Sequence, residues 1–163
     1  MIIIHRHFLI YILVILHSCA PASSSDDYVI CEFAESITSV LLPTGWNCSG
    51  TTNVCNGSLS DWEGIKCAGN RIVGISVAYV GFSGTISSSL GTLGQLTNLE
   101  LQHNYFTGTI PSSIGFLSNI KQIKFNDNSL TGTIPSTIGF LTNLVNCTMD
   151  MNYLEGTIPT TIG

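Results

Sequence analysis

Charged side chains are scarce: Asp, Glu, Lys and Arg make up only 9% of the 163 residues, and only five residues are Lys or Arg. These basic residues are scattered along the chain rather than clustered. A nucleic-acid-binding protein needs a basic stripe to neutralise phosphates, so the sequence argues against a nucleic-acid partner. It argues equally against electrostatic docking on anionic lipid.

Long apolar runs are also missing. The run from Phe8 to Leu16 is shorter than the roughly 20 residues that span a bilayer, which disfavours an anchor helix. It follows a weakly basic start and precedes Ala20-Pro21-Ala22, a small–x–small cleavage pattern. We therefore expect residues 1–22 to be a secretory signal peptide, and any membrane attachment to come from a segment beyond Gly163.

Metal-binding signatures are absent as well. No Cys-x-x-Cys pair or nearby His accompanies the cysteines, so neither a metal nor another cofactor is expected. Four cysteines nevertheless lie within 37 residues: Cys31, Cys48, Cys55 and Cys67. In the oxidising compartment that a signal peptide implies, this clustering predicts two disulfides, for which three pairings are possible.

A 24-residue period runs through the second half of the chain. The tripeptide Gly-Thr-Ile begins at Gly84, Gly108, Gly132 and Gly156. Within a period the apolar residues alternate once, as at Leu99 and Leu101, which is the signature of a short strand. Each period is therefore one coil that cannot bury its apolar face alone, and the coils must stack on each other.

The repeated pattern L-x-x-L-x-L-x-x-N-x-F/L-x-G-x-I-P-x-x-I-G-x-L, over residues 71–163, resembles the plant-type extracellular leucine-rich repeat. Its Gly-x-Ile-Pro segment is more specific than a count of leucines. The resemblance implies an α/β leucine-rich-repeat solenoid, whose 24-residue coils form a parallel β-sheet on the concave face. The first coil departs from the pattern, with Val80 in place of Asn and Ser87 in place of Pro.

Trp46, Cys48 and the segment 62–67 resemble the N-terminal cap of that family, which begins with a short helix. The resemblance places this helix at residues 26–42. It also implies that the four clustered cysteines pair in sequential order, Cys31 with Cys48 and Cys55 with Cys67.

Three segments are expected along the chain: a signal peptide at 1–22, a disulfide-bonded cap at 23–70, and about four repeats at 71–163. The last repeat stops before the Leu that the pattern requires, and its apolar residues would face water. Because a solenoid normally covers such residues with a terminal cap, we expect the chain to be a fragment. More repeats, a short cap, a transmembrane helix or a kinase domain would follow.

One Asn recurs where each strand should end. We expect Asn104, Asn128 and Asn152 to point inward and to bond backbone groups of neighbouring coils, as a structural ladder. Cys147 occupies a position that core aliphatic residues take in other coils, and we expect it to be a small buried hydrophobe.

Function is expected on the outward strand positions, which stacking brings side by side about 4.8 Å apart. The candidate ligand contacts on the concave face are Tyr79, Glu100, Gln102, His103, Lys124, Asn126, Asp127, Thr148, Asp150 and Met151. Polar groups around a few large anchors are typical of surfaces that bind proteins. The opposite charges of Glu100 and Lys124 predict a cross-strand ion pair.

No catalytic residues are predicted. His103 lies beside Asp127, but neither a positioned nucleophile nor a metal cluster accompanies them, and the face is an open slope. The chain is therefore not expected to be an enzyme. Three glycosylation sequons begin at Asn47, Asn56 and Asn146.

Three functions remain open. The resemblance favours an extracellular recognition module, such as the ectodomain of a receptor-like protein or receptor kinase, which binds a protein or peptide ligand. The second is a soluble inhibitor of an extracellular enzyme, as polygalacturonase-inhibiting proteins are. The third is a structural cell-wall or matrix protein. The sequence specifies neither the ligand nor the oligomeric state.

Overall fold

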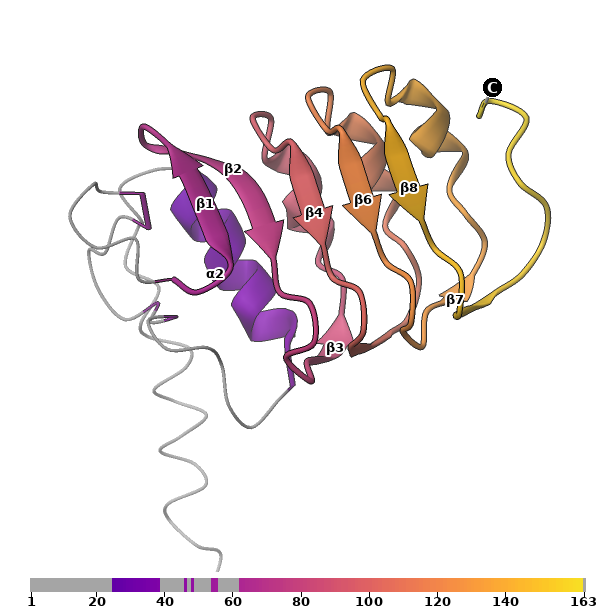
Figure 1. The fold of residues 1–163 in the computed structure, drawn as a ribbon, viewed down its shortest axis with the longest axis horizontal. Helices are drawn as coiled ribbons and strands as arrows, with labels where there is room; N and C mark the ends of the chain where they lie inside the picture. The colour runs from indigo at the N-terminus through magenta and orange to yellow at the C-terminus, as the bar shows by residue number, and fades with distance from the viewer. Residues whose placement is uncertain (1–24, 39–45, 47, 49–53, 56–61, 163) are drawn as a thin grey trace, which may run out of the picture.

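The fold is a curved stack of coils, with a β-sheet on one side and short helices on the other (Figure 1). A computed structural model describes residues 25–38, 46, 48, 54–55 and 62–162. The predicted signal peptide and the sequons at Asn47 and Asn56 lie outside the described residues. The α/β solenoid that the resemblance implies is confirmed.

The main sheet has five strands in the order β1-β2-β4-β6-β8. Its strands are β1 (Ile65–Ala68), β2 (Arg71–Ser76), β4 (Asn98–Glu100), β6 (Gln122–Lys124) and β8 (Asn146–Thr148). β1 is antiparallel to β2, and every later pair is parallel. Leu99 pairs with Ile123, and Ile123 pairs with Cys147. Residues that pair across neighbouring parallel strands are therefore 24 apart, which is the period of the sequence.

After its strand in the main sheet, each coil runs back along the other side of the stack through a short bridging strand and one 3₁₀ turn. The bridging strands are β3 (Ser83–Thr85) beside β5 (Tyr105–Thr107), and β7 (Thr131–Gly132) beside β9 (Tyr153–Leu154). The turns are η1 (Ser88–Thr92), η2 (Ser112–Phe116) and η3 (Ser136–Phe140). Pro111 and Pro135 cap η2 and η3, at positions where the missing N–H of proline costs nothing.

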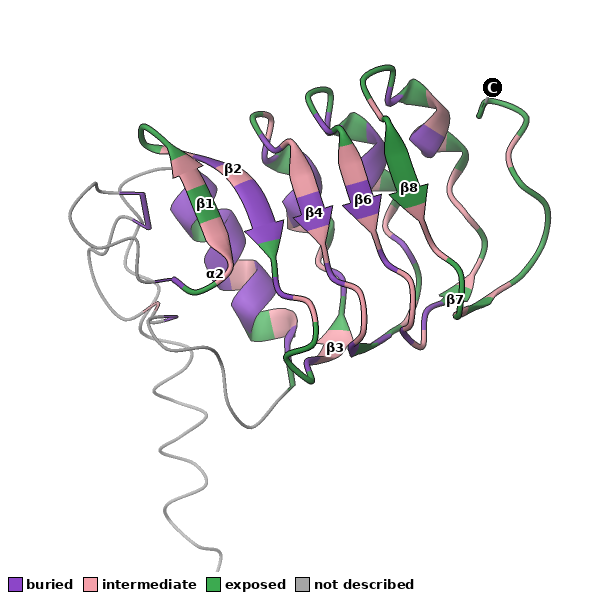
Figure 2. Ribbon diagram, in the orientation of Figure 1, coloured by how far each residue is buried: buried purple, intermediate pink, exposed green. Residues whose placement is uncertain are grey.

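The core lies between the sheet and the 3₁₀ turns (Figure 2). The middle coils bury their apolar side chains most completely: Leu99, Leu101, Ile123 and Phe125 are all fully buried. The stripe of apolar residues that the period predicts is therefore the layer that holds neighbouring coils together.

The 3₁₀ turns pack so closely that a glycine is required in each. A Cβ added at Gly115 would overlap the Thr137 carbonyl of the next coil, and Gly91 meets Ser113 in the same way. We therefore expect Gly115→Ala to lower the free energy of unfolding by about 2 kcal/mol, because neighbouring coils must move apart. Urea denaturation measures this loss. Gly94→Ala is the control, since nothing lies within 4 Å of its added Cβ; an equal loss there would contradict the packing.

The N-terminal helix α2 (Ser25–Ser36) covers the first coil (Figure 1). It buries Phe33, whose ring lies 6.1 Å from the rings of Trp46 and Phe106. Asp26 joins the helix to the sheet, because its Oδ2 accepts hydrogen bonds from the backbone N–H of Ile72 and from Arg71 Nε, both at 2.9 Å.

The predicted helix over 26–42 is too long. The helix ends at Ser36, because the next residues pair with the first coil instead of with the helix. Ile37 forms an antiparallel bridge with Gly84, and the Thr38 N–H donates to the Ser83 carbonyl at 2.8 Å. β-Branched residues favour this extended pairing over another helical turn.

Two disulfides connect the residues that precede the repeats, and their cysteines pair in the order that the resemblance implies. Cys31 is bonded to Cys48, 17 residues away, and Cys55 is bonded to Cys67, 12 residues away. Next to the second bond, the Val54 N–H donates to Asp27 Oδ1 at 3.0 Å. Covalent and polar links therefore attach the same segment to α2 and to β1.

The expectation that Cys147 is buried is wrong: its residue is exposed. Cys147 does take the core-side register of Ile123, but β8 is an edge strand and has a neighbour on one side only. Figure 2 shows the difference, since β4 and β6 carry buried residues and β8 is largely exposed. The partial desolvation that remains raises the pKa of the Cys147 thiol.

Candidate recognition face

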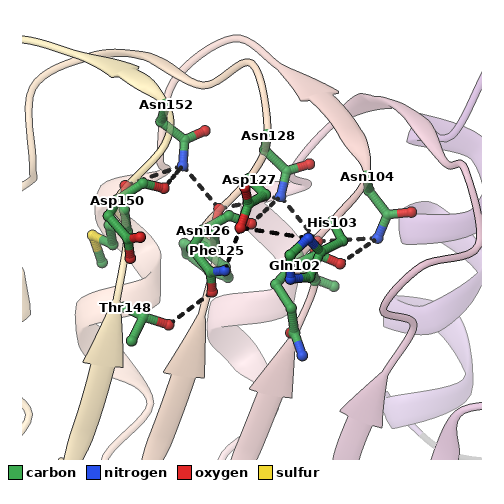
Figure 3. A network of polar contacts seen from close by, with 12 residues as sticks. Gln102, His103, Asn104, Phe125, Asn126, Asp127, Asn128, Thr148, Asp150 and Asn152 are labelled. Atoms are coloured by element: carbon green, nitrogen blue, oxygen red, sulfur yellow. Dashed lines mark hydrogen bonds and ion pairs between the residues drawn. The ribbon is translucent and has the colours of Figure 1, made fainter.

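The ladder asparagines fix the point where each strand ends (Figure 3). Asn128 Nδ2 donates to the carbonyls of Leu101 and Phe125, at 3.0 and 3.1 Å, and its Oδ1 accepts from the Phe106 N–H at 3.0 Å. Asn104 makes the corresponding bonds one coil earlier. Asn152 makes them one coil later, where it is half-buried. Each amide thus links one coil to the coil before it.

A left-handed residue precedes each ladder Asn, and another precedes Val80, which takes the place of the Asn in the first coil. The φ angles are 61° at Tyr79, 56° at His103, 55° at Asp127 and 53° at Met151. This conformation is uncommon for residues other than glycine, and here it recurs in four successive coils. In a regular strand, adjacent side chains point to opposite faces and do not meet. The left-handed conformation of Asp127 lets it contact its neighbour, since Asn126 Nδ2 donates to Asp127 Oδ2 at 2.7 Å.

The left-handed positions form what we call the contact row, made of Tyr79, His103, Asp127 and Met151. The Tyr79 and His103 rings are stacked, with centroids 4.0 Å apart and planes 14° apart. His103 Nδ1 lies 3.4 Å from Asp127 Oδ2 (Figure 3). Three side chains from three coils are therefore held in a line by contacts among themselves.

A second set of polar contacts supports this row. Asn126 not only donates to Asp127 but also accepts a hydrogen bond from Thr148 Oγ1 at 2.9 Å (Figure 3). At the last residues of β4 and β6, the predicted ion pair is present, with Lys124 Nζ 3.8 Å from Glu100 Oε1. Ser76 Oγ also donates to Glu100, at 3.2 Å. We call the contact row and these residues together the recognition face.

Large side chains remain open to solvent along this face. Tyr79 and Met151, at the two ends of the contact row, are each 72% exposed. Two further exposed tyrosines, Tyr105 and Tyr153, are 66% and 72% exposed and were not among the predicted contacts. They directly follow Asn104 and Asn152 and begin the bridging strands β5 and β9. The 24-residue spacing in the sequence puts both tyrosines in the column directly after the ladder Asn, but the set of candidate contacts did not include that column.

The structure brings most of the predicted contact residues together, but not all of them into one network. Gln102 lies beside the contact row with its side chain on the face, and Asp150 lies next to Asn126 across the strands (Figure 3). Asp150 is exposed. Within residues 25–38, 46, 48, 54–55 and 62–162, no group of three or more His, Cys, Asp or Glu side chains is arranged to hold a metal ion.

Comparison with known proteins supports the interpretation of the coils. A profile of the Leucine Rich Repeat family matches residues 95–117 and 119–141, which are two successive coils. These coils are leucine-rich repeats. In the part of the chain that the structure describes, no helix has both the length and the apolar character needed to cross a membrane.

The leucine-rich repeats are related in sequence to a plant receptor kinase. Over 59 residues the chain is 37% identical to the LRR receptor-like serine/threonine-protein kinase GSO2 of Arabidopsis thaliana. That match covers 36% of this chain and 4% of the kinase, so the chain spans a small part of the length of its relative.

Solved structures show the same arrangement of leucine-rich repeats. The LRR ectodomain of the Arabidopsis thaliana receptor kinase GASSHO1/SCHENGEN3, in complex with CASPARIAN STRIP INTEGRITY FACTOR 2, matches with a TM-score of 0.75 and 27% identity. The match covers 83% of this chain and 16% of that ectodomain. The plant peptide hormone receptor RGFR1, in complex with RGF2, matches with a TM-score of 0.53 and 32% identity, over 53% of this chain and 14% of the receptor.

Proposed function

We propose that the chain belongs to an extracellular recognition module, which binds a protein or peptide through the recognition face and takes part in cell-surface signalling. The observation that carries this proposal is the contact row. Tyr79, His103 and Asp127 are aligned before any ligand arrives, by ring stacking, by a polar contact and by a repeated left-handed backbone. Binding to such a surface loses less conformational entropy than binding to mobile side chains.

The shape of the row favours an extended polypeptide as the ligand. It crosses neighbouring strands that are about 4.8 Å apart, so its groups are presented in a line rather than around a point. Exposed Tyr79 and Met151 supply large anchors at its two ends, while Asn126 and Asp150 supply hydrogen-bonding groups beside it. Aromatic anchors surrounded by polar groups are typical of protein-binding surfaces.

The similar proteins support the same function. One is a receptor kinase ectodomain in complex with a named factor, and another is a peptide hormone receptor in complex with RGF2. The two disulfides of the cap fit an oxidising, extracellular location. The proposed role is binding rather than catalysis, since the polar groups of the face contact each other and leave no nucleophile poised beside a base.

Peptide selection tests this proposal. Peptides are selected from a displayed random library against the secreted chain, and their affinities are measured for three variants. We expect His103→Ala and Asp127→Ala each to weaken binding at least about tenfold, since each removes a neighbour that aligns the row. Phe116→Ser is the control, because Phe116 is 62% exposed on η2, on the opposite side of the coil. Binding that depends on Phe116 and not on the row would overturn the proposal.

A further inference from the structure

The side of the stack opposite the main sheet carries two exposed phenylalanine rings. Phe116 and Phe140 are the last residues of η2 and η3, one period apart, and they are 62% and 61% exposed. The two turns are in direct contact, since a Cβ added at Gly115 would overlap the Thr137 carbonyl. Phe116 has a whole coil on each side of it and is as exposed as Phe140, so the exposure of the rings does not depend on where the chain ends. Apolar side chains grouped in this way mark binding surfaces more often than single ones do.

The segments that form this side of the coils are uncharged. Residues 80–99, 104–120 and 128–145 contain no Asp, Glu, Lys, Arg or His. The charged residues of the same coils lie on or beside the strands of the main sheet, as Glu100 and Asp127 do. A charged ligand would lose hydration at the phenylalanine rings without gaining an opposite charge, so this surface suits an uncharged ligand.

The polar groups beside the rings offer acceptors more than donors. In the loop after η2, Asn119 Nδ2 donates to the Gly94 carbonyl at 2.7 Å, and one coil later Asn143 Nδ2 donates to the Ser118 carbonyl at 2.8 Å. Both asparagines are exposed, and among the described residues neither Oδ1 accepts a hydrogen bond. Thr137 Oγ1 donates its one hydrogen to a carbonyl of the coil before it, which leaves its oxygen with free lone pairs. A ligand of this surface must therefore bring hydrogen-bond donors of its own.

We propose that Phe116 and Phe140 form a platform that binds an uncharged polysaccharide. A pyranose ring has an apolar C–H face, which packs on the electron-rich face of an aromatic ring, and hydroxyl groups at its rim, which donate to the acceptors beside the platform. A lipid chain would leave those acceptors without donors, and an extended peptide would need donors for its own carbonyls. This binding is a second function, on the side opposite the recognition face, so the chain holds a polysaccharide and its peptide ligand at the same time.

Affinity electrophoresis of the full chain in native gels tests this inference. Hydroxyethyl cellulose is the neutral probe, and carboxymethyl cellulose, which has the same backbone with negative charges, is its matched control. We expect hydroxyethyl cellulose to retard the wild type, and Phe116→Ser/Phe140→Ser to raise the dissociation constant at least about tenfold. Phe116→Trp/Phe140→Trp should keep the retardation, because indole also presents an aromatic face. Carboxymethyl cellulose should retard none of them, because the chain itself has a formal net charge of −5.

A wild type that hydroxyethyl cellulose does not retard, or retardation that survives in the double Ser variant, would overturn the inference. So would equal retardation by both polymers. Sedimentation of the same proteins covers the remaining occupant: a wild-type dimer that dissociates in the double Ser variant, without retardation of either, would assign the rings to contact between two copies. Both rings are exposed, so the double Ser variant should keep the urea midpoint of the wild type.

The polysaccharide and the peptide ligand are tested by different variants. His103→Ala should weaken peptide binding and leave the retardation by hydroxyethyl cellulose unchanged, since the His103 side chain contacts Tyr79 and Asp127 on the recognition face. Loss of peptide binding in every protein, with normal retardation, would overturn the proposed function alone. Retardation that His103→Ala abolishes would overturn the platform, because the polysaccharide would then lie on the recognition face.

Discussion

Replacing Asn128 with Leu is expected to lower the free energy of unfolding by about 3 kcal/mol. Leucine keeps the volume but leaves the buried Phe106 N–H without its acceptor, which costs about 1–3 kcal/mol. The Leu101 carbonyl loses one of its two donors and keeps the bond from Asn104. The Phe125 carbonyl also loses a bond, at 3.1 Å, from the same amide. Urea denaturation of the wild type and the variant measures the difference in unfolding free energy. The slope of that free energy against urea concentration should be equal in the two proteins.

Asn126→Ala is the matched control for this substitution, because it removes the same side chain type two residues away. Its contacts, to Asp127 and Thr148, lie on the recognition face where water can replace them, so the expected loss is about 0.5 kcal/mol. Equal losses at the two positions would show that the inward and outward assignments are shifted by one residue. Such a shift would move every predicted contact residue to the wrong face.

Removing the second disulfide is expected to cost about 3 kcal/mol. Cys55 and Cys67 close a loop with a sequence separation of 12, and a loop of this size restricts the unfolded chain by about that free energy. The double variant Cys55→Ser/Cys67→Ser should therefore melt well below the wild type, and a reductant should lower its melting temperature further by opening Cys31–Cys48.

Cys147→Ser is the control for the disulfide variant. Cys147 is the free cysteine among the described residues and is exposed, so its replacement should change stability by less than about 0.5 kcal/mol. A large loss with Cys147→Ser, and none with the double variant, would contradict the pairing. Peptide mapping under non-reducing conditions provides an independent check, since a Cys31–Cys67 peptide is incompatible with the structure.

The coil architecture is predictable from sequence because one physical constraint repeats. A strand such as Asn98–Glu100, a turn at Asn104 and a Gly-Thr-Ile segment must each recur at the same spacing if the coils are to stack. Register then needs no long-range information: Glu100 lies beside Lys124 because they are one period apart. The predicted ion pair and the column arrangement of the face follow from that spacing.

Features that do not repeat from coil to coil, or that depend on a single backbone angle, cannot be predicted from the 24-residue period. The end of α2 at Ser36 depends on competition from the first coil, which captures Ile37 in a bridge to Gly84. The exposure of Cys147 depends on the number of strands beside it rather than on its position in the repeat.

The contact row is the part of the candidate site that is hardest to predict from the sequence. Asp is enriched in the left-handed conformation, but Tyr79 and Met151 are not residue types that predict it. The stacking of Tyr79 on His103 follows from this conformation, so it is visible only once the backbone is known. The spacing in the sequence puts His103 beside Asp127, but it does not predict the stacking of the Tyr79 ring on His103.

Hydrogen–deuterium exchange of the secreted chain, with and without a selected peptide, tests the central claim most directly. The account predicts that the peptide slows amide exchange at residues 100–104, 124–128 and 148–152, which carry the recognition face. Exchange in η2 (Ser112–Phe116) and η3 (Ser136–Phe140) should not change, because they lie on the opposite side of the coils. Protection confined to η2 and η3 would contradict the claim that the sheet face is the binding surface.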